Sequence, residues 1–150
     1  MISDLNGGSG VVCNVLYSLF HDQKKPVVIA ILKAYLQALS SGDYDTIMRL
    51  FSPTAIVHSP LYGERPAADF YWELIEDTQR SDITPLDYFE NEARRGAVNF
   101  LYRWTMENGT TVEFDCVDIV EFADDDLITK IKIIYDTDHT RKHFDQLKQV

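Results

Sequence analysis

One acidic residue interrupts an otherwise apolar pattern. Between Val112 and Phe122 the even-numbered residues are all apolar except Asp118. This alternation is typical of a β-strand with one buried face, so Asp118 is expected to point into the interior. Burying an ionised carboxylate in such surroundings costs several kcal/mol unless the group is paired or protonated. Two alternatives stay open: a structural Asp bonded to a buried donor, and a β-bulge that turns the side chain outward.

Tyr35 is the second residue with a possible chemical role. Apolar residues recur at spacings of three and four between Val28 and Leu39, which predicts a helix with one buried face. Tyr35 lies in the middle of that face, where a tyrosine hydroxyl normally finds a polar partner. Because the helix must pack on the sheet, we expect Tyr35 and Asp118 to meet in one apolar cavity.

The elements around these two residues predict an α+β domain. Pro26 begins the first helix, Gly42 ends it, Asp43 caps a second, and Pro66 opens a third. Strands are expected over residues 55–58, 98–106, 111–122 and 127–135, with a tight primed turn at Asn108-Gly109. The order predicts three N-terminal helices packed on a strongly curved antiparallel sheet.

Composition limits the classes of function. The chain has 150 residues, of which 45% are hydrophobic, and a net charge of −10. We expect one domain over residues 26–150, preceded by an N-terminal arm or extra helix over residues 1–25. The negative charge disfavours nucleic acid and anionic membranes as partners. The apolar run 11–20 is too short to span a membrane, and Cys13 and Cys116 are too few for a disulfide scaffold. A cytoplasmic location is therefore expected.

Four stretches of the sequence carry a family resemblance. They are residues 35–43, residues 50–60, the pair Phe70-Tyr71, and residues 112–122. With these, the chain resembles the nuclear transport factor 2-like superfamily, and within it the ketosteroid isomerases and the SnoaL-like polyketide cyclases. The resemblance implies a cone-shaped, cystatin-like α+β barrel with an internal pocket. It also implies a homodimer formed through the outer face of the sheet.

The resemblance implies catalytic roles for particular residues. In the isomerases, residues at the positions of Tyr35 and Asp118 form an oxyanion hole, and Tyr71 would orient Tyr35. In the cyclases, the residue at the position of Asp118 is a general acid/base. The isomerase base position holds Ser59 here, and serine does not shuttle protons near neutral pH without an activating base. His58 is an alternative base, although strand alternation places it opposite Ser59.

These observations predict a domain that binds a small hydrophobic molecule. If it is an enzyme, the chemistry expected is proton transfer of isomerase, cyclase or hydratase type, without a cofactor. The alternative is a non-catalytic ligand-binding or dimerisation module of the same fold. No metal is expected, since His139 and His143 lack a third ligand of clear spacing. The expected pocket wall consists of Ser59, Phe70, Tyr71, Trp104, Phe114 and Tyr135.

Overall fold

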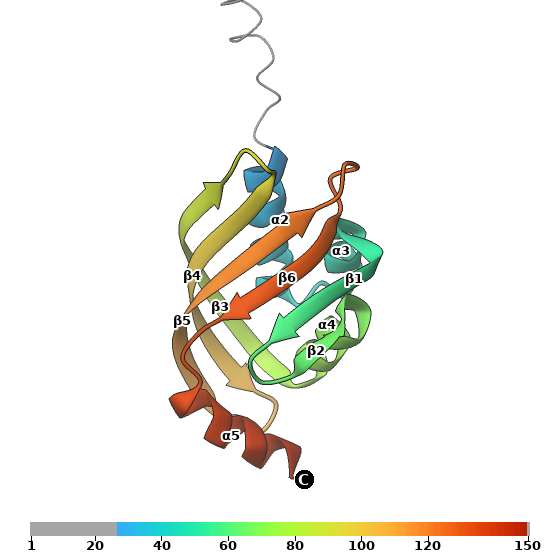
Figure 1. The fold of residues 1–150 in the computed structure, drawn as a ribbon. Helices are drawn as coiled ribbons and strands as arrows, with labels where there is room; N and C mark the ends of the chain where they lie inside the picture. The colour runs from blue at the N-terminus through green and yellow to red at the C-terminus, as the bar shows by residue number, and fades with distance from the viewer. Residues whose placement is uncertain (1–26, 150) are drawn as a thin grey trace, which may run out of the picture.

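The computed structural model describes residues 27–149, drawn as a ribbon in Figure 1. The predicted N-terminal arm and Cys13 lie outside these residues. The helices are α2 (Val27–Ser41), α3 (Tyr44–Leu50), α4 (Ala67–Glu76) and α5 (Asp138–Lys148). The strands are β1 (Phe51–Ser59), β2 (Gly63–Pro66), β3 (Thr78–Glu90), β4 (Arg95–Met106), β5 (Thr111–Phe122) and β6 (Ile128–Ile134).

The six strands form one curved sheet in the order β2-β1-β6-β5-β4-β3. Helices α2, α3 and α4 lie on one side of the sheet and α5 lies at its end, so the predicted α+β class is confirmed (Figure 1). The prediction of a purely antiparallel sheet is wrong at one place, because β1 and β6 pair in parallel. No helix within residues 27–149 is both long and apolar enough to cross a membrane.

Helix α2 presents Tyr35 to the sheet. Its apolar stripe is buried as predicted, with Leu32 and Tyr35 almost fully covered. Helix α2 comes very close to β4 at Gly96, where an added Cβ would lie 2.8 Å from a Val28 methyl carbon. A larger residue there would force this packing to shift, so the glycine fixes how closely α2 and its tyrosine approach the sheet.

Of two predicted local features, the N-terminal cap of α3 is confirmed and the turn type between β4 and β5 is not. Asp43 caps α3 as predicted, because its Oδ1 accepts a hydrogen bond of 3.0 Å from the Thr46 backbone N–H. The hairpin at Asn108-Gly109 also forms, but the primed turn was wrong. Only Gly109, with φ +83°, has a left-handed backbone there. The connection spans four residues, and such loops need only one left-handed position.

Two strands of the sheet, β2 and β3, are not predicted by the sequence pattern. Strand β3 lies at the edge of the sheet and pairs only with β4. Most of its side chains are exposed or half-buried, so no apolar alternation marks it. It also contains Pro85, which an edge strand tolerates because one side of its backbone makes no ladder bonds. The sheet register shifts between Pro85 and Asp87, as expected next to a residue that lacks an N–H.

Candidate functional site

A small apolar cavity lies between the helices and the sheet, with a volume of about 40 Å³. It receives side chains from α2, α4, β1, β4, β5, β6 and the segments that follow β1 and β6. Among the residues that the structure describes, Asp118 is the only charged one on its wall. The wall comprises Tyr35, Leu39, Ser59, Tyr62, Phe70, Leu74, Phe100, Tyr102, Trp104, Phe114, Cys116, Asp118, Ile133 and Tyr135.

Three buried side chains form a chain of hydrogen bonds at this cavity. The Tyr71 hydroxyl donates to the Tyr35 hydroxyl over 2.9 Å, and Tyr35 donates to Oδ2 of Asp118 over 3.0 Å. Each of the three residues is at most 1% exposed. The sequence placed Tyr35 and Asp118, 83 residues apart, on facing apolar surfaces, and the structure brings them into direct contact.

The strand geometry explains why Asp118 points inward. The pairing of β4 with β5 runs without a shift from Arg95–Glu121 to Thr105–Thr111, so no bulge reverses the face. Cys116, two residues earlier on the same face, is 3.5 Å from Oδ1 of Asp118 and donates to it through its thiol. Each carboxyl oxygen therefore has one protein donor, and neither donor carries a charge.

Burial changes the protonation of this group of residues. Loss of hydration raises the pKa of Asp118 from 3.8 to about 7, although the bonds from Tyr35 and Cys116 partly oppose the rise. Burial, followed by the neighbouring Asp118, raises the pKa of Tyr35 well above its usual value. Asp118 can therefore gain and lose a proton near pH 7, while Tyr35 keeps its proton and can donate a hydrogen bond.

Five of the six residues predicted for the pocket wall line the cavity, and Tyr71 lies behind the wall. Ser59, Phe70, Trp104, Phe114 and Tyr135 all line the cavity. Tyr71 lies behind Tyr35 and reaches the cavity only through it.

Ser59 has a structural task in addition to its place on the wall. Its hydroxyl oxygen accepts hydrogen bonds from the backbone N–H groups of Leu61 and Tyr62, at 3.3 and 3.2 Å. These bonds shape the turn that follows β1, as serine hydroxyls commonly do. No basic partner that would activate this hydroxyl as a proton acceptor is bonded to it within residues 27–149.

His58 lies on the other face of β1. Its neighbour Val57 is fully buried, whereas the His58 side chain is 36% exposed. Its Nδ1 lies 3.2 Å from a carboxylate oxygen of Glu64 on β2. Strand alternation therefore separates His58 from the cavity, and it has no part in the function proposed below.

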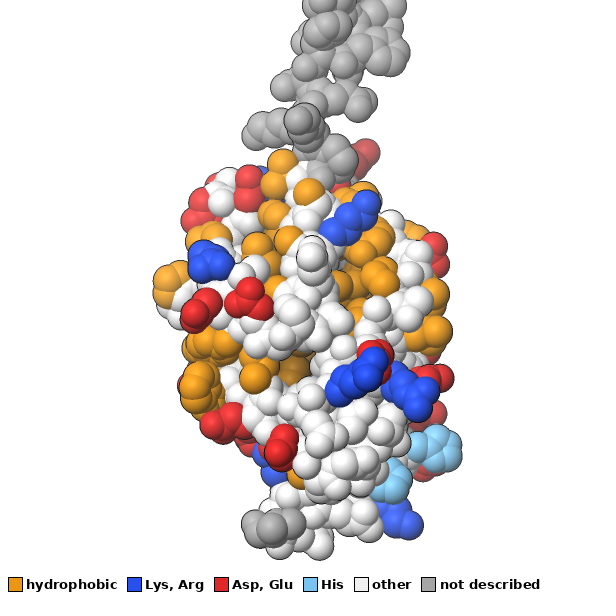
Figure 2. Space-filling model, turned by 180° about the vertical axis from the view of Figure 1, so that it is seen from behind, with side chains coloured by type: hydrophobic (Ala, Val, Ile, Leu, Met, Phe, Trp, Pro, Cys, Tyr) orange, Lys and Arg blue, Asp and Glu red, His pale blue; other side chains and the backbone are white. Residues whose placement is uncertain are grey.

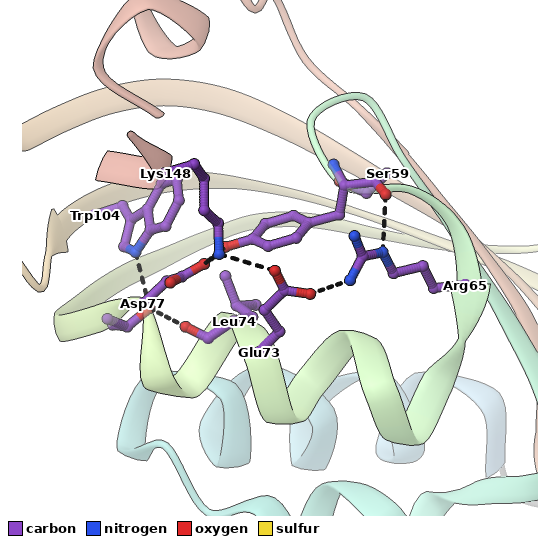
Figure 3. A network of polar contacts seen from close by, with 9 residues as sticks. Ser59, Arg65, Glu73, Leu74, Asp77, Trp104 and Lys148 are labelled. Carbon is purple, nitrogen blue, oxygen red and sulfur yellow. Dashed lines mark hydrogen bonds and ion pairs between the residues drawn. The ribbon is translucent and has the colours of Figure 1, made fainter. Parts of the chain in front are cut away.

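Sequence reasoning missed Tyr62, which closes one part of the cavity wall. It lies in the turn after β1, where no periodic pattern indicates burial. Its hydroxyl donates to Asp77 over 2.7 Å, and its ring meets the ring of Phe144 on α5 at 4.8 Å between centroids. Nearby, Lys148 of α5 binds Glu73 and Asp77 (Figure 3). Helix α5 therefore packs behind Tyr62 and supports this part of the wall, although none of its own residues lines the cavity.

The wall offers no evident place for a metal ion. Within residues 27–149, no three His, Cys, Asp or Glu side chains gather in a way that could hold one. Its polar groups instead suit a ligand that exchanges a proton or accepts a hydrogen bond.

Several solved structures share this fold. SalBIII, an epoxide hydrolase/cyclase-like enzyme in pyran ring formation of the polyether salinomycin, is 20% identical, with a TM-score of 0.65 over 76% of this chain and 94% of its own. TerC, co-crystallised with polyporic acid, is 19% identical, with a TM-score of 0.65 over 83% and 99%. A protein from Catenulispora acidiphila with a ketosteroid isomerase-like fold, in complex with trimethylamine, is 11% identical, with a TM-score of 0.62 over 70% and 84%. At these identities the likeness concerns the fold.

Comparison by sequence identifies a family as well as a fold. No curated protein matches the chain. The family model of the SnoaL-like domain matches residues 32–131, which includes Tyr35, Tyr71 and Asp118. This match covers well over half of the chain and nearly all the elements that build the cavity. The chain therefore belongs to the SnoaL-like domain family, as its sequence motifs predicted.

Proposed function

We propose that this SnoaL-like domain binds a compact hydrophobic carbonyl compound and catalyses proton transfer on it without a cofactor. The reaction would be of isomerase, cyclase or hydratase type. The observation that carries the proposal is a fully buried Asp118 on the wall of an apolar cavity, 3.0 Å from the hydroxyl of Tyr35. Asp118 and Tyr35 are the proposed catalytic residues, and Tyr71 positions Tyr35.

In the proposed reaction, Asp118 takes one proton from the substrate and later returns it, so no other reactant is needed. The Asp118 carboxylate takes a proton from the carbon next to the substrate carbonyl, and the C–H electron pair moves to form the enolate. The Tyr35 hydroxyl turns from Asp118 to the enolate oxygen and donates a hydrogen bond to it, supported by the bond from Tyr71. Asp118 then returns the proton to the substrate, and an isomerisation results if it returns to a different carbon.

The remaining wall residues would bind and orient the substrate. Phe114 and Tyr135 stack with their ring centroids 4.1 Å apart, and together they form one apolar surface. Phe70 and Trp104 contribute two more buried rings. Ser59 adds a hydroxyl at the edge of this surface. Aromatic rings around a few polar groups are typical of sites for small planar molecules.

Deuterium exchange tests this proposal before any substrate is known. 2-Tetralone, a compact ketone, would be incubated with the protein in D₂O, and loss of its α-proton signals followed by NMR. We expect Asp118→Asn and Tyr35→Phe to slow exchange by at least tenfold, the usual scale for acid/base groups. The wild-type rate should rise with pH through about 7 as Asp118 ionises. Tyr44→Phe, which removes an exposed hydroxyl outside the cavity, is the matched control. Equal rates in wild type and Asp118→Asn would contradict the assignment.

A second candidate function is ligand binding without turnover. It is favoured by Ser59, which stands where the isomerases carry a base and whose oxygen is engaged by two backbone N–H groups. On this alternative, 2-tetralone would raise the melting temperature of the protein, but its α-protons would exchange no faster than in buffer.

We also propose that the outer face of the sheet joins two copies of the chain. Leu101, Ile119 and Ile134 are 38–43% exposed there, on the adjacent strands β4, β5 and β6. Exposed apolar side chains on one face of a sheet are common at protein interfaces. Light scattering should give a dimer for the wild type and a monomer for Ile119→Lys. A wild-type monomer would overturn this part of the proposal.

A further inference from the structure

A second hollow adjoins the cavity on the helical side of the molecule, the side shown in Figure 2. This hollow, which we call the groove, has a volume of about 450 Å³. It lies where α2 and α4 end and β3 begins. Its wall consists of Leu39, Ser40, Ser41, Gly42, Leu74, Ile75, Thr78, Gln79, Arg80, Ser81 and Tyr102.

The groove and the cavity share part of their walls. Leu39, Leu74 and Tyr102 line both, so these three side chains form a partition between them. The cavity alone, at about 40 Å³, has room for about one water molecule. Ligand sites usually measure roughly 300–1,000 Å³. A carbonyl compound beside Asp118 therefore needs more space than the cavity offers, and the adjoining groove can supply it if the partition moves.

Tyr102 is the polar member of the partition, and its hydroxyl ties the partition to the edge of the sheet. Its hydroxyl lies 2.8 Å from the Ser81 hydroxyl, and Ser81 belongs to the edge strand β3. The Ser40 hydroxyl donates to the Ser81 carbonyl over 3.1 Å, which ties the same strand to the end of α2. One such bond contributes about 1 kcal/mol net, and moving the ring would also break its contacts with the rings of Trp104 and Phe114, so a bound ligand must offset both losses.

The groove differs from the cavity in its chemistry. Hydroxyl groups of Ser40, Ser41 and Ser81 line the groove beside the Tyr102 ring, whereas aromatic rings make up most of the cavity wall. The carbonyl-bearing ends of α2 and α4 also lie here, and helix C-termini favour hydrogen-bond donors over anions. Of residues 27–149, Arg80 is the only charged one on the groove wall, and Asp82 binds its guanidinium at 2.9 Å. These groups suit a neutral, hydroxyl-bearing part of a ligand.

We infer that the groove is the outer half of the ligand site and that Tyr102 is the movable partition between the two halves. The ligand is then an elongated molecule with a compact apolar end beside Asp118 and a neutral, hydroxyl-bearing end in the groove. The inference rests on the proposed use of the cavity as a ligand site, but it requires no turnover.

Tryptophan fluorescence tests the partition. The sequence holds two tryptophans: Trp72 is 56% exposed, whereas Trp104 is 2% exposed and lines the cavity. In a Trp72→Phe background, acrylamide quenching therefore reports access to the cavity. We expect Tyr102→Phe and Ser81→Ala, which each remove the hydrogen bond, to raise the quenching constant of Trp104 at least twofold. Lys148→Gln, which loosens α5 beside Tyr62, should raise it less. Unchanged quenching in Tyr102→Phe, or a larger rise in Lys148→Gln, would overturn the role of Tyr102.

Calorimetry with matched probes tests the chemistry of the groove. The probes are 2-naphthol, 2,6-dihydroxynaphthalene and 6-hydroxy-2-naphthoic acid, which differ only at the far end of the ring system. We expect the dihydroxy compound to bind at least fivefold more tightly than 2-naphthol, and the carboxylate to bind most weakly. Ser41→Phe, which fills the groove, should abolish this preference. Equal affinities for all three, or strongest binding of the carboxylate, would overturn the inference. Since neither readout involves proton transfer, failure here is distinct from failure of the deuterium-exchange test.

Discussion

Two clusters of polar side chains within residues 27–149 both contain carboxyl groups but differ in their surroundings. The inner cluster, Asp118 with Tyr35 and Tyr71, is fully buried and has neutral hydrogen-bond partners. The outer cluster, Lys148 with Glu73 and Asp77, joins α5 to α4 and remains partly exposed (Figure 3). Asp118 of the inner cluster is bonded to uncharged groups, whereas Glu73 and Asp77 of the outer cluster each bind the charged Lys148.

The two clusters should therefore respond to pH with opposite sign. The pKa of Asp118 is raised by burial, so this residue destabilises the fold progressively as pH rises from about 4 to about 7. For Glu73 burial also acts to raise the pKa, but the bond and charge of Lys148, then Arg65, outweigh it and lower the pKa overall. Glu73 thus stabilises the fold above its ordinary pKa, and this contribution is lost as pH falls through the lowered pKa. Exposure to solvent and the presence of a counter-charge, more than residue type, determine how each carboxyl group changes the stability of the fold with pH.

The largest expected effect comes from removing the inner charge. A rise in pKa from 3.8 to about 7, at about 1.4 kcal/mol per unit, corresponds to up to about 4 kcal/mol. We expect Asp118→Asn to be more stable than wild type by up to this amount at pH 8 and similar to it at pH 4. Urea denaturation at the two pH values measures the difference.

Asp115 provides the control, because it lies on the same strand but is exposed. Asp115→Asn should show no comparable change between pH 4 and pH 8. A gain for Asp118→Asn that is the same at both pH values would show that Asp118 titrates normally, and the contrast between the clusters would disappear.

A smaller effect is expected from the second hydroxyl of the inner cluster. Tyr71→Phe keeps the buried ring but leaves the Tyr35 oxygen without its donor. We expect a loss of about 1–2 kcal/mol in the free energy of unfolding, typical of a buried hydrogen bond. Tyr44→Phe, whose hydroxyl makes an exposed bond of 3.3 Å, should change stability by less than about 0.5 kcal/mol. Equal losses of unfolding free energy in Tyr71→Phe and Tyr44→Phe would mean that the buried hydrogen bond stabilises the fold no more than the exposed one.

The smallest effect is expected at the outer cluster. Lys148→Met removes the charge but keeps much of the chain length, and the lysine is 35% exposed. We expect a loss of about 1 kcal/mol or less at low salt, and a smaller loss in 1 M NaCl. Thermal denaturation at both salt concentrations tests this. A loss that is large and insensitive to salt would mean that this cluster behaves as a buried one.

Much of the inner site could be predicted from the sequence because its elements follow simple periods. Alternation along β5 identified Asp118 as an inward acid, and the three-and-four spacing along α2 placed Tyr35 opposite. The same alternation separated His58 from Ser59. Periodicity works here because these elements each bury one continuous face.

The parts that could not be predicted lack such a face. Strand β3 is mostly exposed and contains Pro85, so neither alternation nor propensity marks it. The position of Tyr62 is fixed by a turn, and the partners of Lys148 lie more than seventy residues away in the sequence. Contacts of this kind depend on how the finished elements pack, which a local pattern does not encode.

The parallel pairing of β1 with β6 has a consequence for how the chain folds. Strand β6 lies between β1 and β5, so the first hairpin, β1 with β2, has no place in the sheet until residues 128–134 are available. On a ribosome, the β1–β2 hairpin must therefore wait until residues 128–134 have been synthesised. Such long-range closure favours slow, late folding and leaves strand edges open to chaperones in the meantime.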